Sequence, residues 1–274
     1  MSEFFQALTQ YQFLQTALIA ALLASVGCGI MGPYVVVKRI TFIAGGIAHS
    51  VLGGMGVALY LGGDPLAGAL IAAVVSAVII GWIHLHWRTG EDILIGALWA
   101  IGMAVGILFI SRIPGYQADL ISYLFGNILL VPERELWFMA GLDATLLLVV
   151  ALWHRQILAV VFDEELARLR GLPVTFFYLL LLVLIALTVV LLIHVVGLIL
   201  VLALLTLPAA IAGQYVNSLT RMMLIASMLS MFLSTLGLAM SYSPNLPPGP
   251  SIVLLAGLAY VLSSLLTRGG RRTT

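Results

Sequence analysis

The chain has 274 residues, of which 62% are hydrophobic and only 8% are charged, and its formal net charge is +1. Soluble domains carry about 25% charged residues, so this composition excludes an ordinary soluble enzyme and a disordered protein. A net charge this close to zero gives no electrostatic basis for binding nucleic acid. The single cysteine, Cys28, excludes a disulfide bond within the chain and any paired-cysteine metal or redox site. With a mean hydropathy of +1.18, the chain is typical of a multi-pass membrane protein.

Long apolar runs predict an all-α membrane protein with about nine spanning helices, because one span needs about 20 apolar residues. They lie at about 15–37, 40–61, 66–85, 92–111, 135–154, 173–194, 197–216, 221–241 and 250–267. Residues 2–14 predict a short interfacial helix. The run 119–131 is too short to cross the bilayer and predicts a re-entrant helix buried against protein. No soluble domain is expected, so residues 1–274 are predicted to form a single transmembrane domain.

The basic residues predict how the chain is oriented. If the C-terminus lies inside, Arg112 and Arg134 are the only two of the 12 lysines and arginines in outside segments. Basic residues concentrate in the cytoplasmic loops of membrane proteins. We therefore expect the N-terminus outside and the C-terminus in the cytoplasm.

The second predicted span contains the most unusual candidate residue, His49. It lies about nine residues into the span, so it is roughly 13–14 Å deep, near the middle of a hydrocarbon core about 30 Å thick. Small residues surround it, including Gly45, Gly46, Ser50 and Gly53. One interpretation is a packing histidine hydrogen-bonded to a neighbouring backbone. The other is a cation ligand in a translocation pathway, because ionisable residues inside membranes are often functional.

Four other residues are weaker candidates. Asp143 lies about eight residues into the fifth span, where a charged aspartate costs roughly 2.5–3.5 kcal/mol; it must face protein or water, or be neutral. His194 ends the sixth span and is a candidate for lining an entrance. Pro208 lies deep in the seventh span and indicates either a packing kink or a gate hinge. His84 belongs to a His-x-His pair beside tryptophans, which favours an interfacial belt over a metal chelate.

The segment 162–173 predicts a short amphipathic helix on the inner side. Asp163 is placed to cap it, acids occupy its first turn, and Gly171 and Pro173 close it. It is either an ordinary interfacial helix or a docking element for a cytoplasmic partner. The chain has no phosphate-binding G-x-x-x-x-G-K-[ST] motif, so any ATPase must be another polypeptide.

Four segments in order resemble the permease subunits of bacterial zinc, manganese and iron ABC importers. They are Lys-Arg-Ile-Thr-Phe-Ile at 38–43 with Ala48 and His49, Ser-Tyr-Leu-Phe-Gly-Asn-Ile-Leu at 122–129, Phe-Asp-Glu-Glu-Leu-Ala-Arg-Leu-Arg-Gly at 162–171, and Val-Gly-Leu-Ile-Leu-Val through Leu-Pro-Ala-Ala at 196–210. The proline- and glycine-rich loop before the last predicted span is also similar. The resemblance covers nearly the whole chain.

The resemblance implies a type II ABC importer-like permease in the bacterial inner membrane, without enzymatic activity or a permanently bound cofactor. It implies a dimer of permeases, two cytoplasmic ATP-binding subunits, and an extracytoplasmic protein that delivers the metal. The helix at about 163–171 matches the family's coupling element. Its matching positions are Asp163, Glu164, Glu165, Leu166, Ala167 and Gly171.

Two positions in the second predicted span depart from the family pattern. The usual motif has an aspartate one helical turn before the histidine and a Pro-Gly after it, whereas this chain has Gly45 and Gly53 there. An aspartate–histidine pair suits manganese, iron or zinc. With only His49 kept, either another helix supplies the acid, with Asp143 a candidate, or the pathway has fewer ligands and carries a different metal or a metal complex.

Two other function classes remain open at this point. A secondary transporter would use His49 and Asp143 for proton coupling and would need no ATPase. An intramembrane enzyme is less consistent with the sequence, because H-E-x-x-H is absent. Ser50 also points about 100° away from its neighbour His49 on a helix.

Overall fold

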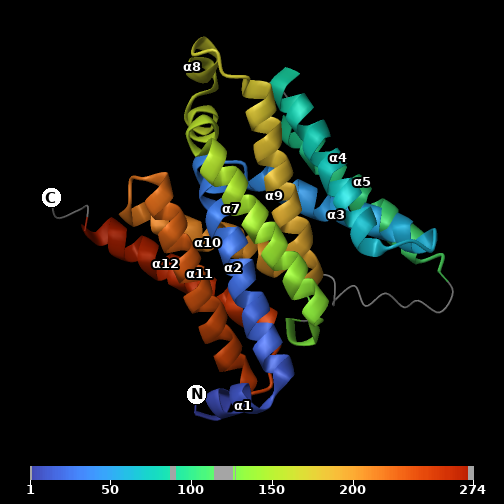
Figure 1. The fold of residues 1–274 in the computed structure, drawn as a ribbon, viewed down its shortest axis with the longest axis vertical. Coiled ribbons are helices and arrows are strands. Elements are labelled where there is room, and N and C mark those ends of the chain that lie inside the picture. Colours follow the sequence, from blue (N-terminus) through green and yellow to red (C-terminus); the bar gives the residue numbers. More distant parts are fainter. Residues whose placement is uncertain (1, 87–90, 114–125, 127, 271–274) are drawn as a thin grey trace. The chain divides into compact units, whose positions relative to one another are not determined.

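The computed structural model describes residues 2–86, 91–113, 126 and 128–270. All regular secondary structure in these ranges is helical (Figure 1). The helices are α1 (Ser2–Gln10), α2 (Gln12–Lys38), α3 (Thr41–Tyr60), α4 (Pro65–His86), α5 (Glu91–Ile110), the 3-10 turn η1 (Ile128–Leu130), α7 (Glu133–Phe162), α8 (Glu164–Leu169), α9 (Val174–Val196), α10 (Leu198–Tyr215), α11 (Leu219–Tyr242) and α12 (Pro248–Gly270).

The all-α fold predicted from the apolar runs is confirmed. Each of the nine predicted spans coincides with one long helix, from α2 to α5, α7, and from α9 to α12. Within the described ranges, eight helices are long and apolar enough to cross a membrane. The remaining one, α9, contains the described apolar stretch Val174–Val190. The short predicted N-terminal helix is also present, as α1.

The fifth span was expected to end near 154 and to be followed by a polar segment, but α7 continues to Phe162. Its backbone leaves helical geometry only at Trp153, with φ −118° and ψ 17°. The polar residues after this break therefore belong to a second helical piece rather than to a loop. The predicted re-entrant helix at 119–131 lies largely outside the described residues; Ile128–Leu130 forms a single 3-10 turn there.

The chain divides into two compact units, which are described separately. The first comprises Met1–Val36, Ile121–Leu147 and Val195–Thr274. In it, close helix contacts depend on small residues of α2: a side chain at Gly29 would collide with Ser227 of α11, and one at Gly32 with Leu205 of α10. Small residues are the usual means by which membrane helices pack closely.

The second unit comprises Val37–Leu120 and Leu148–His194. In this unit α3 packs against both α4 and α5 (Figure 1). A Cβ added at Gly53 would lie 2.8 Å from the carbonyl oxygen of Gly102, and one at Gly102 would lie 2.5 Å from Cα of Ser50. The glycines around His49 thus bring the α3 and α5 backbones into direct contact.

Replacing Gly102 by valine is expected to destabilise the protein by at least about 1–3 kcal/mol, the usual cost of overpacking. Here the clash is with backbone, which cannot rotate away. The matched control is Gly96→Val on the same helix, because a Cβ at Gly96 meets nothing within 4 Å. Thermal unfolding in detergent should show a lower Tm for the first variant only. Equal Tm losses would contradict the close α3–α5 packing.

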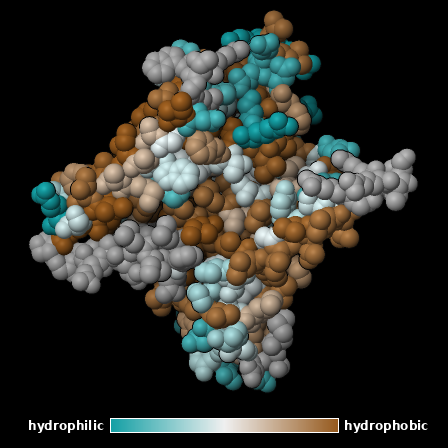
Figure 2. Space-filling view, turned by 180° about the vertical axis from the view of Figure 1, so that it is seen from behind, coloured by the Kyte–Doolittle hydropathy of each residue, from teal (hydrophilic) through white to brown (hydrophobic). Residues whose placement is uncertain are grey.

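The molecular surface fits a lipid environment. Figure 2 shows hydrophobic side chains over much of the described surface of one face. Exposed apolar residues recur one helical turn apart on single helices, as with Leu224, Met228 and Phe232 on α11. Such stripes are expected where helices face hydrocarbon.

Candidate functional site

The structure places His49 in a buried setting within the second unit. Only 8% of its surface is exposed. Its ring stacks on the indole of Trp99 from α5, with centroids 4.0 Å apart and planes 11° from parallel. Its Nδ1 atom is buried and has no hydrogen-bond partner among the described residues. A buried polar atom left unpaired costs about 1–3 kcal/mol, so a hydrogen-bond partner or ligand beyond the described side chains is expected for this nitrogen.

Trp99 is a residue that the sequence did not single out. A Cβ added at Gly45 would lie 4.0 Å from the Trp99 ring, so the indole lies beside both Gly45 and His49, one helical turn apart. Its Nε1 donates to the sulfur of Met103 at 3.2 Å. The only sequence signal for this contact is an aromatic residue within the aliphatic α5, and such a residue does not reveal which helix it faces.

The neighbour of His49, Ser50, faces away towards α4. Its hydroxyl donates to the carbonyl of Ile47 and shares a hydrogen bond with Ser76 of α4, both at 2.7 Å. This agrees with the expectation that Ser50 is badly placed to act with His49. Among the residues that the structure describes, no three His, Cys, Asp or Glu side chains gather closely enough to hold a metal ion.

The other candidate pathway residues are on α7, α9 and α10. Asp143 of α7 belongs to the first unit, is buried with 8% exposure, and has no partner for Oδ2 within the described ranges. His194 lies in α9 of the second unit, but its side chain is outside the described residues. Pro208 is buried within α10. His49 and Asp143 therefore belong to different units of the chain.

The predicted inner helix is present as α8, with both ends capped. The Asp163 carboxylate accepts a hydrogen bond from the backbone N–H of Leu166 at 2.9 Å, as an N-cap residue should. At the other end Gly171 has φ 75°. The N–H groups of Gly171 and Leu172 donate to the carbonyls of Arg168 and Ala167, which is the Schellman arrangement. A helix this short persists because its ends are satisfied.

The exposed residues of α8 are a mixture of charged and apolar side chains. Ala167 is buried. Leu169 is 84% exposed, and Phe162 and Leu166 are also exposed, as is Glu165. Such a mixed exposed surface fits both interpretations of this segment, an interfacial helix and a docking element for a partner.

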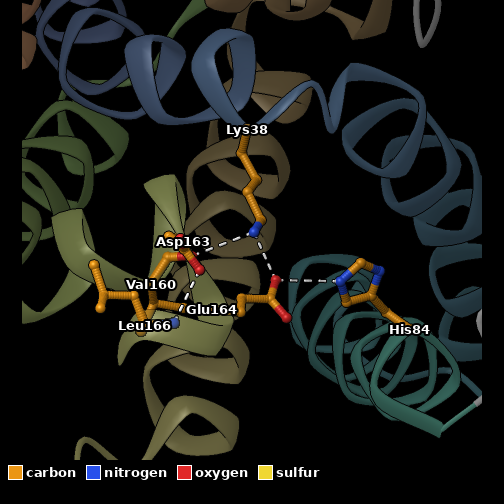
Figure 3. Close-up of polar contacts among 6 residues, drawn as sticks. All are labelled: Lys38, His84, Val160, Asp163, Glu164 and Leu166. Carbon is orange, nitrogen blue, oxygen red and sulfur yellow. Dashed lines mark hydrogen bonds and ion pairs between the residues drawn. The ribbon is translucent and has the colours of Figure 1, made fainter. Parts of the chain in front are cut away.

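Glu164 is directed towards its own chain. Its Oε1 lies 2.6 Å from Nζ of Lys38 at the end of α2 and accepts a hydrogen bond from Nε2 of His84, at the end of α4, at 3.4 Å. Figure 3 shows both side chains reaching this one carboxylate. Lys38 also donates to the carbonyl of Val160 in α7 at 3.2 Å. The side chains of Lys38, Glu164 and His84 are only 15–24% exposed, and we call these three residues the Glu164 cluster.

The cluster keeps Glu164 ionised. The hydrogen bond from His84, together with the hydrogen bond and charge of Lys38, lowers the pKa of Glu164 from 4.5 to about 2, against the opposing effect of burial. Because the folded-state pKa is depressed, the contribution to stability is complete above about pH 4.5 and is lost as the pH falls towards 2. At neutral pH the carboxylate is therefore fully charged.

His84 has partners that the sequence did not indicate. Besides contacting Glu164, its ring stacks on Tyr178 of α9 with centroids 4.5 Å apart. Lys38 Nζ lies 5.9 Å from the centre of the same tyrosine ring. His86 is exposed and its ring stacks on Trp82. The two histidines of the His-x-His pair therefore have different surroundings, as their positions on a helix require.

Comparison with known proteins places the chain in a family. The model of the ABC 3 transport family matches residues 10–267. A probable metal transport system membrane protein of Chlamydia muridarum is 43% identical over 94% of this chain and 90% of its own length. The manganese transport system membrane protein MntC of Halalkalibacterium halodurans is 34% identical over 95% and 89%. The structure of PsaBC from Streptococcus pneumoniae, in complex with Fab, matches with a TM-score of 0.86, 35% identity, and coverage of 96% of this chain and 94% of that one.

The family match spans nearly the whole chain and every helix that positions the residues described above. The relatives align over almost their full lengths, so the similarity is not limited to a single motif. The resemblance drawn from the four motifs is confirmed, and this chain belongs to the ABC 3 transport family.

Proposed function

We propose that this chain is the membrane permease subunit of an ATP-driven ABC importer for a divalent metal ion: zinc, manganese or iron. The observation that carries the proposal is the capped α8, which presents exposed apolar residues from a chain that itself has no nucleotide-binding motif. Family membership and the metal-transport names of the relatives support it. The chain itself carries out no hydrolysis, and ATP binds in a partner subunit.

In this proposal α8 is the coupling helix. Asp163 and Gly171 fix its two ends, Ala167 anchors it, and Glu165, Leu166 and Leu169 contact the ATP-binding subunit. Exposed apolar side chains gain about 1.5–3 kcal/mol each when they are fully buried. The energy for docking therefore comes mainly from Leu166 and Leu169, and movement of the ATPase is passed to the membrane helices through α8.

His49 is proposed as a metal ligand in the translocation pathway. It is buried, and its Nδ1 has no partner among the described residues. Imidazole suits zinc and iron among other metals, and a pathway site must bind weakly enough to release its ion. Asp143 and His194 are proposed as further pathway residues, and Pro208 as a hinge in α10.

The remaining proposals concern assembly. We propose that residues 1–274 act as one permease domain, which pairs with a second copy in a bacterial plasma membrane among its lipids. An extracytoplasmic protein delivers the metal. The distribution of lysine and arginine supports an outside N-terminus and a cytoplasmic C-terminus.

The experiment is metal-dependent growth and uptake in cells that lack this chain, with manganese, iron and zinc tested separately. We expect a defect in uptake of one of them, restored by re-expression of the chain. Normal uptake of all three metals in the deletion strain would contradict the proposal as stated. Cobalt, nickel and metal complexes would then be tested as substrates.

A further inference from the structure

The Glu164 cluster brings residues of three helices together around one carboxylate, and all three residues belong to the second unit. Glu164 is the first residue of α8, Lys38 is the last residue of α2, and His84 lies in the last turn of α4. Tyr178 of α9 packs against both the histidine and the lysine. A charged hydrogen bond as short as the 2.6 Å contact with Lys38 is among the stronger polar contacts in proteins.

Two of these helices lead directly to His49. Lys38 is separated from α3 only by Arg39 and Ile40. Arg39 has φ 62°, a conformation that is uncommon for a residue other than glycine and that fixes a sharp turn. α4 reaches the same region through the hydrogen bond between Ser76 and Ser50, the neighbour of His49. A displacement of α8 would therefore reach α3 by two routes. One runs through Lys38 and the short connection to α3, and the other runs through His84, α4 and the hydrogen bond from Ser50 to Ser76.

We propose that Glu164 is a positioning residue that transmits movement of α8 to α3 and α4, and so links ATP hydrolysis in the partner subunit to the state of the pathway at His49. The proposal rests on the function proposed above, in which α8 docks on the ATPase. It assigns Glu164 a role different from that of Leu166 and Leu169. Those residues face outwards to hold the partner, whereas Glu164 faces inwards to carry the movement.

A carboxylate suits this role because its charge is satisfied by groups from two different helices, α2 and α4. The charge is permanent at neutral pH because the pKa of Glu164 is held at about 2. A glutamine of the same shape keeps the packing of α8 but loses the ion pair with Lys38. The proposed docking surface, which consists of Glu165, Leu166 and Leu169, is then intact. The connection of α8 to α3 through Lys38 is weakened.

The test uses the complete transporter in lipid vesicles, and it measures metal taken up and ATP hydrolysed at the same time. Coupling free energies between sites typically correspond to 5–150-fold effects. In Glu164→Gln we therefore expect metal uptake per ATP to fall by about tenfold while assembly with the ATP-binding subunit is kept. Asp92→Asn is the matched control, since it makes the same chemical change at an exposed carboxylate at the start of α5. This control should take up as much metal per ATP hydrolysed as the unmodified protein does.

A second pair of variants covers the case in which Glu164→Gln does not assemble. Lys38→Met removes the charge but keeps a long apolar side chain, and Lys38→Arg keeps the charge. We expect the methionine variant to lower uptake per ATP and the arginine variant to retain it. An unchanged ratio in the glutamine and methionine variants would overturn the inference. Loss of assembly in both Glu164→Gln and Lys38→Met would also overturn it, because the Glu164 cluster would then only support the structure.

The same measurements separate this inference from the proposed function. If the unmodified transporter shows no ATP-dependent metal uptake, the proposed function fails. If it does show uptake and Glu164→Gln takes up as much metal per ATP, only the role of Glu164 fails.

Discussion

Replacing His49 by alanine is expected to lower metal uptake by about tenfold to hundredfold without preventing assembly. Hydrogen bonds and related contacts to charged groups contribute about 1.5–3 kcal/mol, and each 1.36 kcal/mol is tenfold in rate. His49 is the buried side chain of α3 whose nitrogen has no partner among the described residues. Uptake by the assembled transporter, measured for the metal identified in cells, tests this expectation.

Two further variants separate the contribution of the imidazole nitrogens of His49 from the contribution of its ring to packing. His49→Phe keeps a flat ring that can stack on Trp99, and it should lose uptake as the alanine variant does. His86→Ala removes an exposed histidine at the end of α4 and should leave uptake unchanged. Normal uptake by His49→Phe would make His49 a packing residue and would remove it from the proposed pathway.

The second large effect is expected at the docking surface. Leu169→Glu should weaken binding of the ATP-binding subunit by at least about tenfold, because a buried leucine contributes about 1.5–3 kcal/mol and a buried charge adds a further cost. The side chain is 84% exposed in the chain alone, so the substitution should not disturb folding. Co-purification and a binding titration with the isolated ATP-binding subunit measure the effect.

Leu61→Glu is the matched control for this variant. Leu61 is 74% exposed and follows α3 at the end opposite Thr41, so the same substitution there should leave ATPase binding intact. Equal binding by both variants and by the unmodified chain would show that α8 is not the docking element. Combining Leu166→Glu with Leu169→Glu should strengthen the effect if both side chains enter the same partner surface.

Much of the fold follows from local sequence patterns. The nine long helices match apolar runs because each spanning helix must satisfy its own backbone within the lipid. α8 was predictable for a different reason: its capping residues Asp163 and Gly171 are local signals. The continuation of α7 to Phe162 was missed because His154, Arg155 and Gln156 read as the start of a polar loop, whereas they continue the helix beyond the break at Trp153.

The contacts that matter most for the candidate site were not predictable. The partners of Glu164 lie 126 and 80 positions away in the chain, and no local pattern reports such pairs. The same holds for Trp99 and His49, which meet only because α3 and α5 pack through glycines. The sequence identified the residues that carry charge or a ring nitrogen, but helix packing decides which of them meet.

ATP-dependent metal uptake by the reconstituted transporter tests the central claim most directly. Vesicles containing this chain, its ATP-binding subunit and the extracytoplasmic binding protein should accumulate the metal when ATP is supplied on the side of α8. Vesicles lacking the ATP-binding subunit should not accumulate it, even with a proton gradient imposed. Uptake driven by a proton gradient through this chain alone would contradict the account and would instead identify a secondary transporter.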